Sequence, residues 1–452
     1  MEPKKQTVIF VLIAVITTAA VAAGVTYVVL APSPEGEVDA LEIYHWWTSG
    51  GEAAAITALV DVFEAQYPDT TVQEVQIAGG GGFEMRVKIK TLMLAGQPPD
   101  TFQIHNGYEW TIFYEANLLN NIDHIWTTAL KNAVPDVIED ISKGPDGHYY
   151  SVPVNIHRSN VLWCNLEILN DTGIDPATLT SWSAFWAACE AIIANPNYTI
   201  TAPVAMGEQW TAAHAFEQIL ASVGIDAYEA WINGDIDSGT ATHYADLLTA
   251  CEIYENLTDY INSDWAALSW DSAIAKLTAA TPTAAFAIMG DWANGEFFQA
   301  GWDHGTNYTT IGVPGTANMY GLVVDCFEKP KNIPHPTNVD RWLGVVASNA
   351  GQDAFNPLKG SISARTDANI SKYGAYQQSA IADFNAIDAS ATSYMFPSVV
   401  HGSGAPEAFN SDFIPLIGAL TAGSATASGT ATAIAALAVT HASDFTRVWS
   451  LD

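Results

Sequence analysis

Strand and helix patterns alternate between residues 41 and 105, and this alternation constrains the fold more than any other feature of the chain. Apolar side chains alternate as in a strand at 41–45 and again at 72–77. Between them, 56–67 carries an apolar stripe at helical spacing. A second helix precedes a short strand at 101–104. This order predicts an α/β layer built on a largely parallel sheet.

The strand at 101–104 runs into two polar side chains, Gln103 and His105. Ligands of α/β proteins bind beyond the carboxyl ends of strands. We therefore expect Gln103 and His105 to face a binding cleft, although their spacing fits two ordinary loop residues equally well.

Composition indicates a folded chain that avoids nucleic acid. With 452 residues, 49% of them hydrophobic, the chain has room for more than one domain and for real cores. Its net charge of −33 arises because 16 Lys and Arg face 49 Asp and Glu. Such a surface repels phosphate backbones, so we predict no nucleic-acid partner.

The N-terminus predicts a single-pass membrane anchor. Lys4 and Lys5 precede an uncharged run at 7–31, which as a helix rising about 1.5 Å per residue more than covers a hydrocarbon core of about 30 Å. The lysines place the N-terminus in the cytoplasm and the globular part outside the cell. Residues 32–38 would form a short stalk. A cleaved signal peptide is the alternative.

The four cysteines do not have the spacing of a zinc site. Outside the cell a disulfide is allowed, and Cys189 and Cys251, both in predicted helices, could form one or could remain free buried thiols. We predict no metal and no cofactor.

No motif predicts catalysis, because neither a nucleophile with its base nor a placed carboxylate pair is recognisable. Aromatic and polar residues instead recur together at the ends of predicted elements. A sugar requires this combination, since its C–H faces lie on indole rings while its hydroxyls need directional and often charged partners. The pairs are Trp46 and Trp47 with Glu52, Gln103 with His105, Glu208 with Trp210, Ser269 with Trp270, and Asp291 with Trp292.

Several segments resemble the extracytoplasmic solute-binding proteins of ABC sugar importers, of the maltose-binding type and closest to its glucose-binding branch. They are 41–47, 98–105, 151–160, 206–211, 268–270, 289–292, 352–363 and 400–402. The resemblance implies the type II periplasmic-binding-protein fold, with two α/β lobes joined by a hinge. The lobes would comprise 39–154 plus 319–358, and 155–318 plus 359–452.

The resemblance also implies which residues bind the sugar. Four tryptophans would supply the flat apolar surfaces on which the sugar lies, namely Trp46, Trp47, Trp270 and Trp292. Other side chains would bond its hydroxyls: Glu52, Gln103, His105, Asp325, Lys359 and His401. Alternatively, Asp325 and Lys359 could pair with each other. His157 and Arg158 are expected to hold the hinge.

We therefore predict that the protein binds a sugar and releases it chemically unchanged. A mono- or disaccharide, glucose or a related hexose, would be bound by lobe closure and delivered to an ABC permease in the membrane. The alternatives are an anchored extracellular glycoside hydrolase and a binder of oligosaccharides.

Overall fold

The computed structural model describes residues 40–236 and 241–451. The predicted anchor at 7–31 and the stalk at 32–38 lie outside these ranges. Among the described residues, no helix is both long and apolar enough to cross a membrane.

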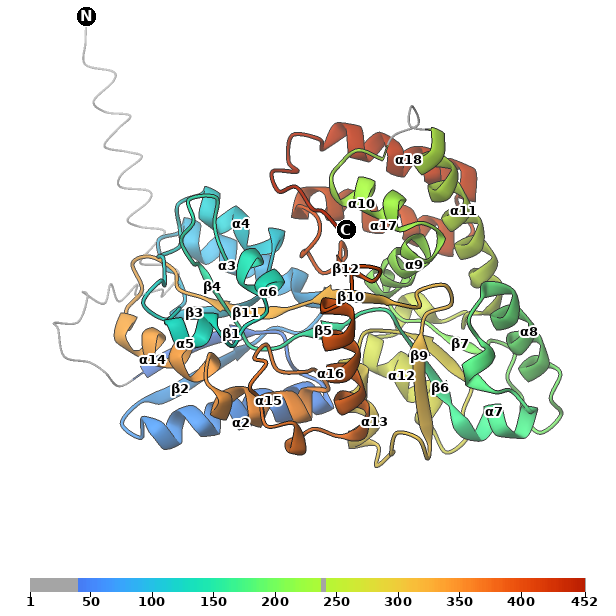
Figure 1. The fold of residues 1–452 in the computed structure, drawn as a ribbon, viewed down its shortest axis with the longest axis horizontal. Helices are drawn as coiled ribbons and strands as arrows, with labels where there is room; N and C mark the ends of the chain where they lie inside the picture. The colour runs from blue at the N-terminus through green and yellow to red at the C-terminus, as the bar shows by residue number, and fades with distance from the viewer. Residues whose placement is uncertain (1–39, 237–240, 452) are drawn as a thin grey trace, which may run out of the picture. The chain divides into compact units, whose positions relative to one another are not determined.

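The first sheet has five strands in the order β2-β1-β3-β11-β4 (Figure 1). They are β1 (Ala40–His45), β2 (Thr71–Gln76), β3 (Thr101–His105), β4 (Ser151–Pro153) and β11 (Asp325–Glu328). The predicted strand and helix alternation is confirmed for β1 to β3, which pair in parallel. The largely parallel sheet is only partly correct. Strand β11 begins opposite the end of β3, with Asp325 paired to His105, and therefore runs antiparallel to it.

Helices connect and flank the strands of the first sheet. They are α2 (Gly50–Gln66), α3 (Phe83–Leu94), α4 (Tyr108–Glu115), α5 (Thr128–Lys131), α6 (Asp136–Ile141), α14 (Pro336–Val346) and α15 (Asn349–Lys359). The predicted stripe on α2 is buried, from Ile56 to Phe63, and α2 packs on α15. Pro357 and Gly360 in the sequence predict a turn at 356–361. Instead α15 continues through Pro357, and the chain turns at Gly360, whose φ is +96°.

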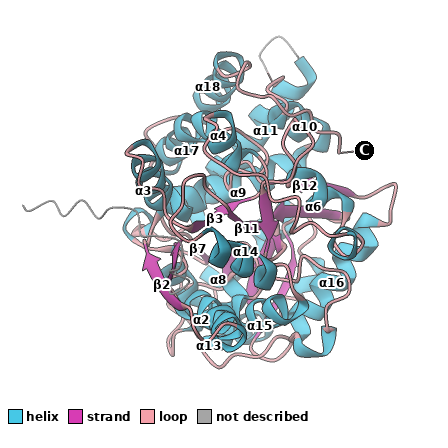
Figure 2. Ribbon diagram, turned by 90° about the vertical axis from the view of Figure 1, so that its left-hand side faces the viewer, coloured by secondary structure: helices cyan, strands magenta, loops and turns pink. Residues whose placement is uncertain are grey.

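A second α/β layer contains a four-stranded sheet in the order β7-β8-β6-β9. Its strands are β6 (Val161–Asn165), β7 (Val204–Ala205), β8 (Phe286–Ile288) and β9 (Tyr308–Gly312). The accompanying helices are α7 (Leu166–Thr172), α8 (Trp182–Ile193), α9 (Gln209–Val223), α10 (Ile225–Ile232), α11 (Ala241–Leu257), α12 (Trp270–Thr278), α13 (Ala293–Gln299), α17 (Glu407–Thr421) and α18 (Ala427–Thr440). Figure 2 shows helices on both sides of the strands of the protein.

The Ala-, Thr-, Ser- and Gly-rich run at 421–432 predicts an irregular segment, but helix α18 begins within it. Thr426 caps the helix by accepting a hydrogen bond from the Gly429 amide. Its alanines are the strongest helix formers, which outweighs the glycine and threonine between them.

A small sheet, β12-β10-β5, lies where the chain passes between the two layers. It comprises β5 (His157–Arg158), β10 (Met319–Val323) and β12 (Tyr394–Pro397). Strand β4 leads into β5, and β10 leads into β11. The chain therefore crosses between the two layers twice in this small sheet, once through β5 and once through β10. Helix α16 (Ala375–Asp388) packs on β10 and β12. Strand β12 was not predicted.

All four cysteines are free and buried, so the suggested disulfide between Cys189 and Cys251 is absent. Cys189 lies on α8, which packs on α7, whereas Cys251 lies on α11, which packs on α9 and α18. Burial raises the pKa of both thiols, that of Cys251 to about 12, which keeps them protonated and unreactive.

Two helical glycines give a test of the packing around α15. At Gly351 a Cβ would lie 2.2 Å from the Val345 carbonyl oxygen, whereas at Gly344 it would meet nothing within 4 Å. We expect Gly351→Ala to lower the free energy of unfolding by about 1–3 kcal/mol. Gly344→Ala should raise it by up to about 1 kcal/mol, since alanine favours helix. Urea denaturation measures both, and equal effects would contradict this packing.

Candidate functional site

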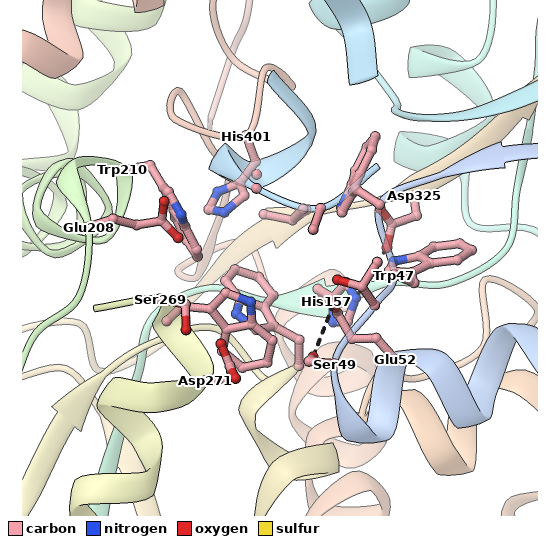
Figure 3. Close-up of a pocket in the computed structure, with 18 of the residues that line it drawn as sticks. Trp47, Ser49, Glu52, His157, Glu208, Trp210, Ser269, Asp271, Asp325 and His401 are labelled. Atoms are coloured by element: carbon pink, nitrogen blue, oxygen red, sulfur yellow. Dashed lines mark hydrogen bonds and ion pairs between the residues drawn. The ribbon is translucent and has the colours of Figure 1, made fainter. Parts of the chain in front are cut away.

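A cavity of about 470 Å³ opens between elements of the two α/β layers (Figure 3). Its wall comes from the loop between β1 and α2, the ends of β3 and β10, the first turn of α9, the 266–271 segment and the loop carrying His401. This volume lies within the range of about 300–1,000 Å³ usual for small-ligand sites.

Eleven of the thirteen residues predicted for a sugar site line this cavity. They are Trp46, Trp47, Glu52, His105, Glu208, Trp210, Trp270, Trp292, Asp325, Lys359 and His401. Gln103 and Asp291 do not line it but lie behind residues that do. Gln103 accepts a hydrogen bond from the Trp46 amide and donates one to Asp325, at 3.1 and 2.9 Å.

Asp325 is a buried carboxylate in the wall, where β10 passes into β11. Its Oδ1 accepts from Gln103 Nε2, and its Oδ2 accepts from Asn155 Nδ2 at 2.7 Å and lies 3.3 Å from His157 Nε2. Burial alone would raise its pKa. The hydrogen bond and charge of His157, with His105 and Lys359 nearby, instead hold the pKa of Asp325 well below its usual range. The wall therefore presents a fixed negative charge.

Glu52 and Lys359 form a buried ion pair of 2.7 Å beside Asp325. Glu52 lies in the first turn of α2 and Lys359 in the last turn of α15, so each charge also opposes the partial charge of its helix end. Asp325 and Lys359 were considered as partners, but the bonded partner of Lys359 is Glu52.

His105 faces the cavity and is fixed from behind by Glu109 on α4. His105 Nδ1 lies 2.9 Å from Glu109 Oε2, and Arg86 Nη1 lies 2.8 Å from the other carboxylate oxygen. Burial would raise the pKa of Glu109, but Arg86 and His105 lower it. The Nδ1 proton of His105 is thus committed to Glu109, which leaves Nε2 toward Asp325, 3.8 Å away.

His157 lines the cavity, a position that the sequence did not indicate. Its Nδ1 bonds to Asp291, whose other oxygen accepts from the Arg158 amide at 2.9 Å. Burial would lower the pKa of His157, but the charge of Asp291 raises it overall. The crossing segment also carries Asn155, Arg158 and Asn160, so nothing in the sequence distinguished His157 as a lining residue. Ser49 and Asp271 are further lining residues that were not predicted, and Ser269, which also lines the cavity, was named only as the polar neighbour of Trp270.

Aromatic rings form the remainder of the wall. Trp292 lies 4.9 Å from the His401 ring and 6.2 Å from Trp210, measured between centroids. Trp46 lies 4.9 Å from His105. Trp47 is fully buried against Phe355 and contributes mainly to the core.

His214, Glu217 and His401 form a group whose ligand atoms lie within 4.8 Å of one another. Two histidines and a carboxylate could in principle bind a metal ion. The Glu217 carboxylate, however, already accepts hydrogen bonds from the Ser398 hydroxyl, the Gln218 amide group and two backbone amides. A metal would have to displace these donors, so we do not assign one.

Residues 46–353 match the family described as bacterial extracellular solute-binding protein. The chain belongs to this family. It is 39% identical over 392 residues to an uncharacterised ABC transporter extracellular-binding protein of Pyrococcus horikoshii, covering 86% of this chain and 85% of that one. It is 30% identical over 397 residues to a probable sugar-binding periplasmic protein of Rhizobium meliloti, covering 87% and 91%.

The fold of this solute-binding protein is also that of solved periplasmic sugar receptors of type II. One of them is the bacterial solute receptor AcbH, described as having an exclusive preference for β-D-galactopyranose. It superposes with a TM-score of 0.74 at 17% identity, covering 90% of this chain and all of that one. The resemblance noted in the sequence is therefore confirmed at the level of family and fold.

The ion pair of His157 predicts a pH dependence of stability. Because the folded pKa is raised, the pair stabilises fully below the unfolded pKa of about 6.5. This stabilisation is lost as pH rises through the folded pKa. The difference in unfolding free energy between the native protein and His157→Gln should therefore shrink as pH rises above about 6.5. The exposed pair of His124 supplies the control His124→Gln. A difference for His157→Gln that stays constant with pH would contradict the pairing.

Proposed function

We propose that this protein captures a sugar in the cavity beside Asp325 and delivers it unchanged to the permease of an ABC importer. One observation carries the proposal: buried charged groups and indole rings converge on one small cavity. Asp325, Glu52 and Lys359 offer charged hydrogen bonds, which are stronger than neutral ones. Trp270 and Trp292 offer flat apolar faces. The names of relatives as sugar-binding proteins support the same ligand class.

Closure of two lobes would trap the ligand. We infer lobes at 39–154 plus 319–358 and at 155–318 plus 359–452, with the crossings through β5 and β10 as the hinge. Support comes from ion pairs across the cleft, where Lys90 and Arg86 of α3 meet Glu407 of α17. A sugar stabilises the closed form to the extent that it binds that form more tightly than the open one.

The ligand we favour is glucose or a related hexose. Epimers differ by one hydroxyl, and a cavity of about 470 Å³ also leaves room for a disaccharide or a short oligosaccharide. The uncharged run at 7–31 supports an anchor that keeps the protein beside its permease.

A panel of sugars tests the proposal. Calorimetry with D-glucose, D-galactose, D-xylose and maltose should give saturable binding for at least one sugar, and chromatography should recover that sugar intact. Release of a sugar from an aryl glycoside would instead favour the hydrolase, and no response to any carbohydrate would refute the proposal.

Single substitutions should separate the charged wall from the aromatic faces. Asp325→Asn and His105→Ala each remove a hydrogen bond involving a charged or buried group, so affinity should fall by about 1.5–3 kcal/mol. Trp270→Ala should cost about 0.5–1.5 kcal/mol. Trp186→Ala is the matched control, because Trp186 stacks on Tyr260 outside the cavity. Equal losses for Trp270→Ala and Trp186→Ala would contradict the assignment of the aromatic face.

A further inference from the structure

A buried carboxylate is connected to the cavity through one hydroxyl group. Glu217 lies on α9 and is fully buried, and its Oε1 is 2.7 Å from Ser398 Oγ. Ser398 Oγ is in turn 2.8 Å from Nδ1 of His401, which lines the cavity. The three groups form a continuous chain from the protein interior to the ligand site.

Hydrogen-bond accounting fixes every proton in this chain. An ionised Glu217 can only accept, so the single hydroxyl proton of Ser398 must point to it. The His401 amide donates to one lone pair of Ser398 Oγ, at 3.1 Å. The second lone pair faces His401 Nδ1, which must therefore carry a proton. Burial, with three neighbouring histidines and Arg86, lowers the pKa of His401 well below its ordinary value, so its ring is neutral and Nε2 is an acceptor.

We propose that Glu217 is a positioning residue that acts through Ser398 to set which nitrogen of His401 is protonated, so that Nε2 accepts a hydrogen bond from a sugar hydroxyl. The claim that Nε2 accepts a hydrogen bond from a sugar hydroxyl rests on the proposed function. The assignment of the His401 tautomer does not, because it follows from contacts within the protein.

The hydrogen bonds that link Glu217, Ser398 and His401 can reverse their direction when Glu217 takes up a proton. One proton enters from the cavity at Nε2, the Nδ1 proton passes to Ser398 Oγ, and the Ser398 proton passes to Glu217. Glu217 then donates to Ser398, Ser398 donates to Nδ1, and Nε2 becomes a donor. The number of hydrogen bonds between these groups is conserved, so the two states differ mainly in the polarity shown to the ligand.

Both states are accessible near neutral pH. Burial raises the pKa of Glu217 to about 7, even though Ser398, two backbone amides and Gln218 favour the anion. Other titratable and charged groups also lie near Glu217 and His401. Near Glu217 are Tyr228 and His214, whose Nδ1 is 3.5 Å from Glu217 Oε1. Near His401 are His105, His157, His214 and Arg86. His214 stays neutral, because burial lowers its pKa to about 3.

Glu217→Gln imitates the protonated state without changing the shape of the side chain. The Val399 and Val400 amides donate to Glu217 Oε2, so the carbonyl oxygen of a glutamine must occupy that position. Its NH₂ group would then donate to Ser398, which must donate to His401 Nδ1. The Gln218 amide, which donates to Glu217 Oε1 in the native protein, must turn so that its own Oε1, unbonded in the native protein, accepts from the new NH₂ group. The variant is therefore expected to hold His401 with the proton on Nε2 at every pH.

Nitrogen NMR of ¹⁵N-histidine-labelled, sugar-free protein reads the tautomer directly, with His401→Gln identifying the signal. In the native protein at about pH 9, well above the range in which Glu217 titrates, we expect the proton on Nδ1. In Glu217→Gln we expect it on Nε2. Glu64→Gln, at an exposed site on α2, should match the native protein.

The proposal is overturned if the native protein carries the proton on Nε2 at that pH, or if a folded Glu217→Gln keeps it on Nδ1. Should Glu217→Gln fail to fold, the tautomer of His401 in the native protein is followed with pH instead. A tautomer that does not change between about pH 5 and pH 9 also overturns the proposal. The affinity for D-glucose should fall about tenfold or more in Glu217→Gln and stay unchanged in Glu64→Gln. Absence of any sugar binding by the native protein would count against the proposed function and leave the tautomer result standing.

Discussion

A negative charge buried at Asp325 is the constraint on which the rest of the site depends. An isolated carboxylate cannot be taken out of water without hydrogen bonds and opposite charge. Here Gln103 comes from the end of β3, whereas Asn155 and His157 come from the crossing segment. The end of β3 and the segment that carries Asn155 and His157 must therefore pack against each other before Asp325 has its hydrogen-bond partners. The cavity lies where these two parts of the chain are in contact.

The same arrangement recurs around the cavity. Each of three histidines in its wall has a carboxylate behind it: Glu109 behind His105, Asp291 behind His157, and Glu217 behind His401 through Ser398. Such partners fix the ring orientation and the position of the proton, so a ligand meets preorganised donors and acceptors and pays little to order them. The chemistry suits reversible capture, since none of these groups is arranged to activate a nucleophile.

Local patterns predicted much of this molecule. Periodicity was sufficient for β1 to β3 and for α2 and α3, because each satisfies its own backbone hydrogen bonds or pairs with a near neighbour. The pairing of aromatic with polar residues, together with the family resemblance that implied Asp325, Lys359 and His401, identified eleven lining residues. It misplaced Gln103 and Asp291, since a sequence does not show whether a polar group faces a ligand or supports one that does.

The features that were missed depend on contacts between residues far apart in the chain. Strand β12 is short and exists because it pairs with β10, and β11 runs antiparallel because it enters the sheet from the crossing. Pro357 suggested a turn, yet it lies in the last turn of α15, where few backbone bonds depend on it. The carboxylates behind the histidines come from positions 4 to 184 residues away and carry no local signature.

The central claim is that two halves of the protein close around a sugar. Spin labels at Thr91→Cys on α3 and Asp412→Cys on α17 would report this motion, because both sites are exposed and all four native cysteines are buried. Pulsed electron paramagnetic resonance should show a longer, broader distance distribution without ligand, and a shorter, narrower one when a binding sugar saturates the protein. Identical distributions with and without a sugar that calorimetry shows to be bound would contradict closure.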